Sequence, residues 1–181
     1  MLVNYNKHFS LFKDIVVDQS SRFGIDPALV LAIMHTESNF NPRARSPVPA
    51  YGLMQLVPKT GGRDAYLFVY NKDRVLNADY LYVPKNNIEL GCAYIKKIRS
   101  VYFREIKNDI SAYYCTIAAY NTGPGNVAKA LTGEKKLKPA INQINKLPPD
   151  QLYRKLVNNL PYKESRKYLK TVDGRIEMYK Q

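Results

Sequence analysis

Residues 26–41 constrain the fold more than any other part of this sequence. Asp26-Pro27 is a typical helix start, with Asp as the N-cap and Pro at the first helical position. The run Ala28–Met34 that follows is apolar on nearly every face of a helix, which is typical of a helix surrounded by core. Pro42 disfavours helical backbone at the residue before it, so we expect the helix to end within 38–41. The sequence therefore predicts a protein built around one central buried helix.

The rest of the chain is expected to be mainly α-helical. Apolar spacing, capping residues and breaks at Pro and Gly predict further helices at 8–23, 51–57, 84–104, 109–120, 124–132, 140–146, 149–159 and 162–180. Residues 64–83 are rich in aromatic and β-branched types around Asn-Lys-Asp, so a small β-hairpin is expected there. The 181 residues contain no repeat and no clear linker, which favours a single domain over 1–181.

The charge balance of the chain predicts an anionic partner. Lys and Arg total 28 and Asp and Glu total 15, which gives a net charge of +13. Such a charge attracts nucleic acid, an anionic membrane surface or an acidic polymer. We find no nucleic-acid-binding motif and no aromatic residues interleaved with Lys and Arg as a stacking surface, so nucleic acid is not expected. No apolar run reaches about 18 residues, so no transmembrane helix is expected either.

The two cysteines and two histidines are too few for a disulfide scaffold or a metal site. Cys92 and Cys115 both lie among apolar neighbours in predicted helices, so they are expected to be small core residues; a single bridge is the alternative. His8 and His35 add too few ligands for a metal site. We therefore expect neither a metal nor a cofactor.

Glu37 is the clearest candidate for a catalytic residue in this sequence. It is the first acidic residue after Asp26, and it lies near the C-terminal end of the predicted apolar helix. The helix dipole presents negative partial charge at that end, and Ile33 and Met34 one turn earlier would exclude water. Both effects raise the pKa of a carboxyl group, and a protonated carboxyl group can act as a general acid. The alternative is an ordinary solvated glutamate at a frayed helix end.

Further short motifs accompany Glu37 in a fixed order. They are His35-Thr36-Glu37-Ser38-Asn39-Phe40-Asn41-Pro42, Ser46-Pro47, Tyr51-Gly52-Leu53-Met54-Gln55, Ala118-Ala119-Tyr120-Asn121-Thr122-Gly123 and Glu164-Ser165-Arg166-Lys167-Tyr168-Leu169. In this order and at this spacing, the motifs resemble the catalytic domain of the SLT-type lytic transglycosylases, which cleave bacterial peptidoglycan. The likeness runs from about residue 10 to residue 178, so it covers nearly the whole chain.

The resemblance implies a goose-type lysozyme-like α fold and a reaction without water. It implies that Glu37 protonates the glycosidic oxygen between N-acetylmuramic acid and N-acetylglucosamine. The same carboxylate then takes a proton from the muramoyl 6-hydroxyl, which attacks the anomeric carbon and closes a 1,6-anhydro ring. No cofactor is implied, and peptidoglycan glycan strands are the expected partner.

The resemblance also carries over five supporting residues. Ser46 is expected to hydrogen-bond Glu37 or the acetamido group of the substrate, although an ordinary loop serine is the alternative. Gln55 is expected to exchange hydrogen bonds with sugar hydroxyls. Tyr120 and Asn121 match a Tyr-Asn pair that lines the saccharide groove. Tyr168 matches a tyrosine whose hydroxyl approaches the catalytic carboxylate.

Other functions remain open at this point. A hydrolytic goose-type muramidase would need a second carboxylate to activate water, and folding could supply Asp64, Asp73 or Glu89. A non-catalytic cell-wall or polyanion-binding module is the alternative outside enzymes.

The expected compartment follows from the resemblance as well. Residues 1–10 lack a basic stretch followed by an apolar one, so no export signal is expected in this sequence. The implied activity nevertheless favours the periplasm or the periplasmic face of the outer membrane. There the basic charge, or a lipid anchor outside this sequence, would allow association with the membrane surface. A monomer is expected.

Overall fold

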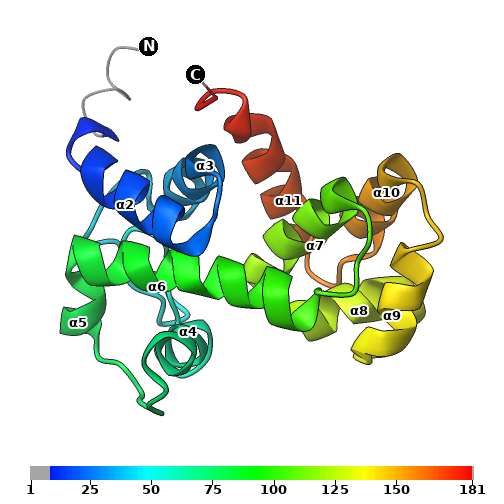
Figure 1. Cartoon of the computed structure of the whole chain (residues 1–181), viewed down its shortest axis with the longest axis horizontal. Coiled ribbons are helices and arrows are strands. Elements are labelled where there is room, and N and C mark those ends of the chain that lie inside the picture. The colour runs from blue at the N-terminus through cyan, green and yellow to red at the C-terminus, as the bar shows by residue number, and fades with distance from the viewer. Residues whose placement is uncertain (1–8, 181) are drawn as a thin grey trace. The chain divides into compact units, whose positions relative to one another are not determined.

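The computed structural model describes residues 9–180 and consists almost entirely of helices (Figure 1). In chain order they are α2 (Lys13–Phe23), α3 (Pro27–Ser38), α4 (Gly61–Tyr70), α5 (Ala78–Tyr82), α6 (Pro84–Lys97), the π-helix η1 (Ile98–Tyr102), α7 (Asp109–Thr122), α8 (Pro124–Thr132), α9 (Leu137–Ile144), α10 (Pro149–Asn159) and α11 (Lys163–Ile176). The mainly α prediction is therefore confirmed. His8 and the predicted start of the first helix lie outside the described residues.

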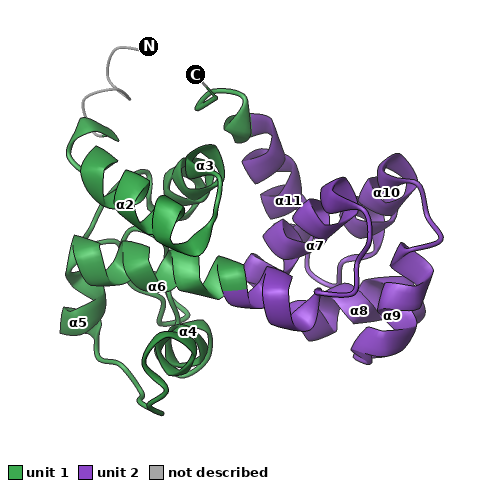
Figure 2. Ribbon diagram, in the orientation of Figure 1, with its two compact units in different colours: residues 1–96, 175–181 green, residues 97–174 purple. Residues whose placement is uncertain are grey.

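The helices group into two compact units (Figure 2). Unit 1 is residues 1–96 and 175–181, and unit 2 is residues 97–174. Unit 1 thus holds α2 to α5, nearly all of α6 and the last turn of α11. Unit 2 holds η1, α7 to α10 and most of α11. The single domain over 1–181 stays a prediction.

The core of unit 1 surrounds α3, as the sequence predicted. Every residue from Ala28 to His35 is buried. The Asp26 side chain caps the helix by accepting a hydrogen bond from the Ala28 N–H (2.8 Å). Around this core, Glu89 of α6 accepts hydrogen bonds from Arg22 of α2 (2.5 Å) and from the Tyr70 hydroxyl of α4 (2.7 Å). One buried carboxylate therefore ties three helices together.

The short helix predicted at 51–57 is wrong, because these residues form a tight turn. Tyr51 and Leu56 exchange two backbone hydrogen bonds of 3.1 Å each. Gly52 and Gln55 have positive φ values of 80° and 47°. Positive φ cannot be part of a right-handed helix, so the turn reverses the chain instead of continuing as a helix.

The hairpin predicted near 64–83 is also wrong, since α4 and α5 occupy this stretch. Gly62 and Ala65 are buried three residues apart, which is the spacing of one helical face and not of a strand. Asn71 ends α4 with a left-handed φ of 52°. The Asn77 side chain caps α5 by accepting from the Tyr80 N–H (2.9 Å). Asn71, which begins the Asn-Lys-Asp sequence that suggested a hairpin turn, is therefore the C-cap of a helix.

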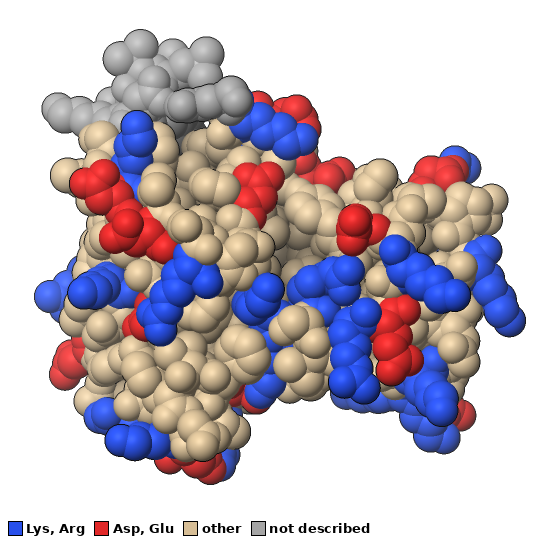
Figure 3. All heavy atoms as spheres, viewed as in Figure 1, with Lys and Arg blue, Asp and Glu red and all other residues tan. Residues whose placement is uncertain are grey.

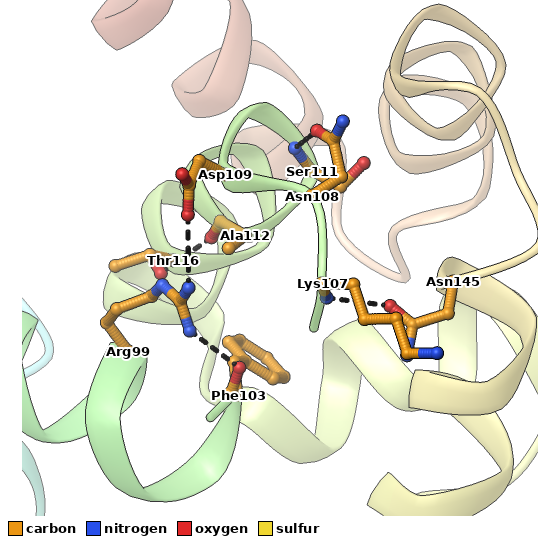
Figure 4. Close-up of polar contacts among 9 residues, drawn as sticks. All are labelled: Arg99, Phe103, Lys107, Asn108, Asp109, Ser111, Ala112, Thr116 and Asn145. Carbon is orange, nitrogen blue, oxygen red and sulfur yellow. Dashed lines mark hydrogen bonds and ion pairs between the residues drawn. The ribbon is translucent and has the colours of Figure 1, made fainter. Parts of the chain in front are cut away.

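In unit 2, side chains hold the loop after η1 in place (Figure 4). The Arg99 guanidinium donates to the Phe103 carbonyl oxygen (3.0 Å) and lies 3.3 Å from the Asp109 carboxylate at the start of α7. The Asn145 side chain, at the end of α9, accepts from the Lys107 N–H and donates to the Glu105 carbonyl oxygen, both at 2.9 Å. Side chains of η1 and of the end of α9 thus hold the loop, and Arg99 also links it to the start of α7.

Both cysteines are buried and free, so the prediction of core cysteines is confirmed. Burial raises the pKa of Cys92 to about 12, and it raises the pKa of Cys115 as well. Since the thiolate is the reactive form, neither side chain is a nucleophile near neutral pH.

The positively charged side chains are spread over the surface and do not gather in one patch on the face shown (Figure 3). On the face drawn in Figure 3, Lys and Arg are spread over both units with Asp and Glu between them. Among the helices of residues 9–180, we find none with the length and apolar character that crossing a membrane requires.

Candidate functional site

Glu37 lies in the last turn of α3, where the helix leaves the core. The helix is buried through His35, and the next three residues, Thr36, Glu37 and Ser38, are half-buried. Asn39 then ends the helix with a left-handed φ of 51°, and its N–H donates to the His35 carbonyl oxygen (3.2 Å). The carboxylate therefore emerges at the C-terminal end of a rigid, buried helix.

The 51–56 turn is joined directly to this end of α3. Ser38 Oγ donates to the Leu53 carbonyl oxygen at 2.8 Å. Leu53 and Met54 are completely buried, so the turn is part of the core and not a surface loop. Met54 is therefore a core residue. The Glu37 motif and the Gly-Leu-Met-Gln motif thus meet within unit 1.

Asn87 of α6 fixes the 51–56 turn from the opposite side, and the sequence reasoning missed this residue. Its side chain is completely buried. Its Oδ1 accepts from the Met54 N–H (2.7 Å), while its Nδ2 donates to the carbonyl oxygens of Tyr51 (2.9 Å) and Leu81 (2.8 Å). All polar positions of the amide are used, so the Asn87 side chain substitutes for regular secondary structure around the motif.

Two glycines allow α6 to approach the turn this closely. Gly52 has a φ of 80°, and a Cβ there would collide with the Asn87 side chain and the Leu81 carbonyl. A Cβ on Gly91 would collide with the Met54 side chain. Only a glycine at position 52 therefore fits this close approach. Asn87 and Gly91 lie one turn apart on an otherwise apolar face of α6. This pattern, an asparagine followed one turn later by a glycine, is the sequence feature that could have revealed the contact.

Gln55 is oriented by its own loop. Its Nε2 donates to the carbonyl oxygens of Ala44 (3.1 Å) and Gly52 (2.9 Å). Both amide hydrogens are thereby used, which leaves Oε1 as an acceptor for a sugar hydroxyl. The prediction for Gln55 is thus limited to accepting hydrogen bonds from sugar hydroxyls, and it stays a prediction.

Ser46 is held in the 45–51 loop. Its N–H donates to the Ala50 carbonyl oxygen (3.2 Å), and its hydroxyl donates to the Val48 carbonyl oxygen. The hydroxyl proton therefore serves a hydrogen bond within the loop, which favours the alternative that Ser46 is an ordinary loop serine. Its oxygen can still accept a hydrogen bond, for example from an acetamido N–H. The role of Ser46 toward Glu37 or the substrate stays a prediction.

His35 and Thr36, which precede Glu37, contact the end of the chain. His35 Nδ1 lies 2.8 Å from the Tyr179 hydroxyl, and Arg175 Nη1 donates to Thr36 Oγ1 at 3.1 Å. Burial lowers the pKa of His35, and the nearby Arg175 charge lowers it further. The imidazole is therefore neutral in the folded protein near neutral pH.

This histidine predicts a loss of stability in acid. The pKa of His35 is lower in the folded chain than its ordinary value of 6.5, so the unfolded chain binds a proton more readily. The free energy of unfolding is therefore expected to fall as the pH drops below about 6.5 toward the lowered pKa. We expect urea unfolding at about pH 7.5 and about pH 5 to show a smaller pH dependence for His35→Gln than for the unchanged chain. An equal dependence in both proteins would contradict the assignment.

The other predicted site residues lie in unit 2. Tyr120 and Asn121 end α7, with Tyr120 buried and Asn121 half-buried. Gly123 stops the helix with a φ of 84°, as expected of a turn-forming glycine. Tyr168 is buried in α11. Glu37, Ser46 and Gln55 therefore belong to unit 1, and Tyr120, Asn121 and Tyr168 belong to unit 2.

Two of the three alternative carboxylates are fully engaged. Both oxygens of Glu89 accept hydrogen bonds, one from Arg22 and one from Tyr70. Asp73 receives a bidentate pair from Arg63, at 2.5 and 2.6 Å, and this pair lowers the pKa of Asp73. Asp64 lies in the first turn of α4, where its charge adds to the burial that raises the pKa of Tyr94 to about 12. Glu89 and Asp73 are thus bound as structural ion pairs.

Two cavities lie elsewhere in the molecule. In unit 2, a cavity of about 700 Å³ lies between residues 104–107 and the end of α9. In unit 1, a cavity of about 380 Å³ at the start of α4 is lined by Asp64, Asp73 and Tyr94 among others. Neither is lined by Glu37 or the five supporting residues. Within residues 9–180, no group of three His, Cys, Asp or Glu side chains is arranged to hold a metal ion.

Comparison with known proteins gives consistent matches. Residues 14–143 match the family described as the Transglycosylase SLT domain. Membrane-bound lytic murein transglycosylase C of Cronobacter sakazakii is 41% identical over 166 residues, which cover 91% of this chain and 45% of that protein. The protein of the same name from Mannheimia succiniciproducens is 38% identical over 181 residues, covering 99% and 50%. The chain thus spans about half the length of these curated relatives.

The resemblance predicted from the sequence is therefore confirmed. Within the chain, Thr60–Asp64 and Glu164–Leu169 predict a likeness to membrane-bound lytic murein transglycosylase C in particular, and the two relatives of that name confirm this prediction.

Solved structures agree on the fold. An inactive variant of the lytic transglycosylase Slt from Pseudomonas aeruginosa superposes with a TM-score of 0.68 at 27% identity, covering 92% of this chain and 23% of that one. The 70 kDa soluble lytic transglycosylase in complex with bulgecin A has a TM-score of 0.66 at 24% identity, covering 93% and 24%. The predicted lysozyme-like, mainly α fold is thereby confirmed.

Proposed function

Because this chain belongs to the Transglycosylase SLT domain family, we propose that it is a peptidoglycan lytic transglycosylase. The bond cleaved joins N-acetylmuramic acid to N-acetylglucosamine in the glycan strand. Glu37 donates its proton to the glycosidic oxygen as the bond to the anomeric carbon breaks. The resulting carboxylate removes a proton from the muramoyl 6-hydroxyl, whose oxygen attacks the anomeric carbon. Glu37 thus gives up one proton and regains one, and no water is consumed.

The observation that supports this proposal most directly is the anchoring of Glu37. The carboxylate lies on the final turn of a buried helix, and Ser38 ties that turn to the 51–56 motif. A general acid needs such a fixed position, because proton transfer depends on reach and orientation. The chain also carries the other family motifs in order, over 91% or more of its length in the two curated relatives.

The engaged carboxylates favour this reaction over hydrolysis. A hydrolase needs a second carboxylate, either about 6.5–9.5 Å from the acid to activate water or about 5–5.5 Å away as a nucleophile. Glu89 and Asp73 both have their oxygens bound to cations or hydroxyls. An internal hydroxyl nucleophile removes the need for either residue.

The supporting residues are proposed to bind the glycan strand. Gln55 Oε1 accepts from a sugar hydroxyl, and Ser46 accepts from or orients the acetamido group. Tyr120, Asn121 and Tyr168 contact the sugar rings of the substrate. These assignments rest on the family motif at each position.

Product analysis tests the proposal. Purified peptidoglycan digested with this chain is expected to give muropeptides one water lighter than hydrolytic products, with 1,6-anhydromuramic ends, in mass spectrometry. Reducing ends would show hydrolysis and direct attention to Asp64. Wall binding without any product would favour the non-catalytic module.

The proposed partner and location follow from the same assignment. Peptidoglycan glycan strands are the partner, and the dispersed charge of +13 favours the carboxylates of their peptide stems. The relatives are named as membrane-bound proteins, which supports a place in the cell envelope. We place the chain as a monomer in the periplasm or at the periplasmic face of the outer membrane, with association to the membrane surface through basic charge or a lipid anchor.

A further inference from the structure

The last described residues of the chain pack on the helix turn that carries Glu37. Tyr179 reaches His35 through its hydroxyl, 2.8 Å from Nδ1, and Arg175 donates to Thr36 Oγ1 at 3.1 Å. Phe40 completes the contact, because its ring stacks on His35 (5.6 Å between centroids) and meets the Tyr179 ring edge-on (6.2 Å). The chain end thus contacts α3 through two polar interactions, and the Tyr179 ring lies edge-on to both His35 and Phe40.

The contacts bracket Glu37 in the sequence. On its N-terminal side, His35 and Thr36 are held by Tyr179 and Arg175. On its C-terminal side, Ser38 is held by the Leu53 carbonyl oxygen. Two segments of unit 1, residues 175–179 and the 51–56 turn, therefore hold the residues on either side of Glu37. The backbone of Glu37 cannot shift without breaking at least one of these hydrogen bonds.

The His35–Tyr179 contact is a hydrogen bond between an imidazole nitrogen and a phenolic hydroxyl. Near neutral pH the buried imidazole is neutral, so Nδ1 can accept the Tyr179 hydroxyl proton. The adjacent Arg175 guanidinium is positively charged, so it disfavours protonation of His35. The Tyr179 ring also keeps its edge-on contacts with His35 and Phe40 whether or not the hydroxyl is present. Removing the hydroxyl alone therefore isolates the polar contact.

We propose that Tyr179 and Arg175 are positioning residues for Glu37, so that the C-terminal segment is part of the catalytic machinery of unit 1. This inference rests on the proposed function, in which Glu37 is the general acid and base. A small displacement of an acid from its reaction geometry slows the chemical step without weakening substrate binding. The segment should therefore affect turnover more than affinity.

The variant Tyr179→Phe tests this on soluble, uncrosslinked glycan strands. We expect kcat to fall about 10-fold and KM to stay within about twofold, because the acid is displaced and the binding residues are not. Met178→Ala is the matched control, since Met178 lies in the same segment with its side chain half exposed to solvent. Its kcat is expected to equal that of the unchanged chain. Circular dichroism checks that each variant is folded.

A pair of variants at His35 adds a readout that a merely structural role would not give. His35→Gln supplies an amide oxygen that can accept the Tyr179 hydroxyl, so most of kcat should be retained. His35→Leu removes the acceptor and should lower kcat as much as Tyr179→Phe does. Equal kcat for both His35 variants would overturn the proposal, as would a rise in KM at unchanged kcat in Tyr179→Phe.

Failure of this inference differs from failure of the proposed function. If Glu37→Gln is inactive and Tyr179→Phe has normal kcat, the positioning role is wrong and the acid assignment stands. If Glu37→Gln keeps its activity, the acid assignment is wrong, and positioning through Glu37 is wrong with it. If Glu37→Gln is inactive and Tyr179→Phe loses only kcat, both are supported.

Discussion

Glu37→Gln is expected to lower the turnover of peptidoglycan by about 10⁴-fold while the chain stays folded and still binds the cell wall. General acid–base catalysis by one group contributes about 10²–10⁴-fold, and here the same carboxylate serves both steps. Glutamine has nearly the same shape, so the contacts of His35, Thr36 and Ser38 around it should persist. Release of 1,6-anhydromuropeptides, followed by mass spectrometry, measures the loss.

The control for this variant is Glu134→Gln, which makes the same chemical change at an exposed ion pair with Lys136 in unit 2. Its turnover is expected to match that of the unchanged chain. Sedimentation with insoluble peptidoglycan measures wall binding of both variants. Activity of Glu37→Gln within about tenfold of the unchanged chain would show that another group supplies the proton.

Asn87→Ala is expected to have the largest effect on stability, about 4 kcal/mol, because it removes three hydrogen bonds between a completely buried side chain and the backbone. The Met54 N–H and the Leu81 carbonyl oxygen lose their Asn87 partner, while the Tyr51 carbonyl oxygen keeps its hydrogen bond from the Leu56 N–H. Each buried group that loses its partner costs about 1–3 kcal/mol, and the deleted amide leaves a small cavity as well. The change in the free energy of unfolding can be measured by urea denaturation.

The neighbouring residue provides a matched control for this prediction. Asn86 is half-buried and makes one side-chain hydrogen bond, from Nδ2 to the Tyr80 carbonyl oxygen at 3.1 Å. Asn86→Ala is therefore expected to cost only about 1 kcal/mol. Similar losses for the two alanine variants would mean that the 51–56 turn does not depend on Asn87. The turn orients Gln55, so we also expect Asn87→Ala to weaken substrate binding in whatever fraction remains folded.

Local sequence patterns predicted the elements whose ends are marked by local chemistry. Asp26-Pro27 marked the start of α3, and its apolar run indicated a buried helix. The breaks at Gly123 and Pro149 marked helices in unit 2 equally well. Each of these cues acts within one helical turn, so it does not depend on the tertiary structure.

Residues 51–57 were mispredicted because their conformation depends on distant partners. The 51–56 turn needs Asn87, more than 30 residues along the chain, to satisfy its backbone. The contact between His35 and Tyr179 spans 144 residues, and no local pattern encodes such a pair. The catalytic candidate could therefore be found from its motif, while the residues that hold it in place required the structure.

The two buried thiols have a consequence for the making and handling of this protein. Cys92 and Cys115 are the only cysteines in the chain, and both are free. No cross-link contributes to the folded state, so folding requires neither an oxidant nor a disulfide isomerase. The chain should fold to the same state in a reducing cytosol and in an oxidising compartment. Reductants in a purification buffer should leave both its stability and its activity unchanged.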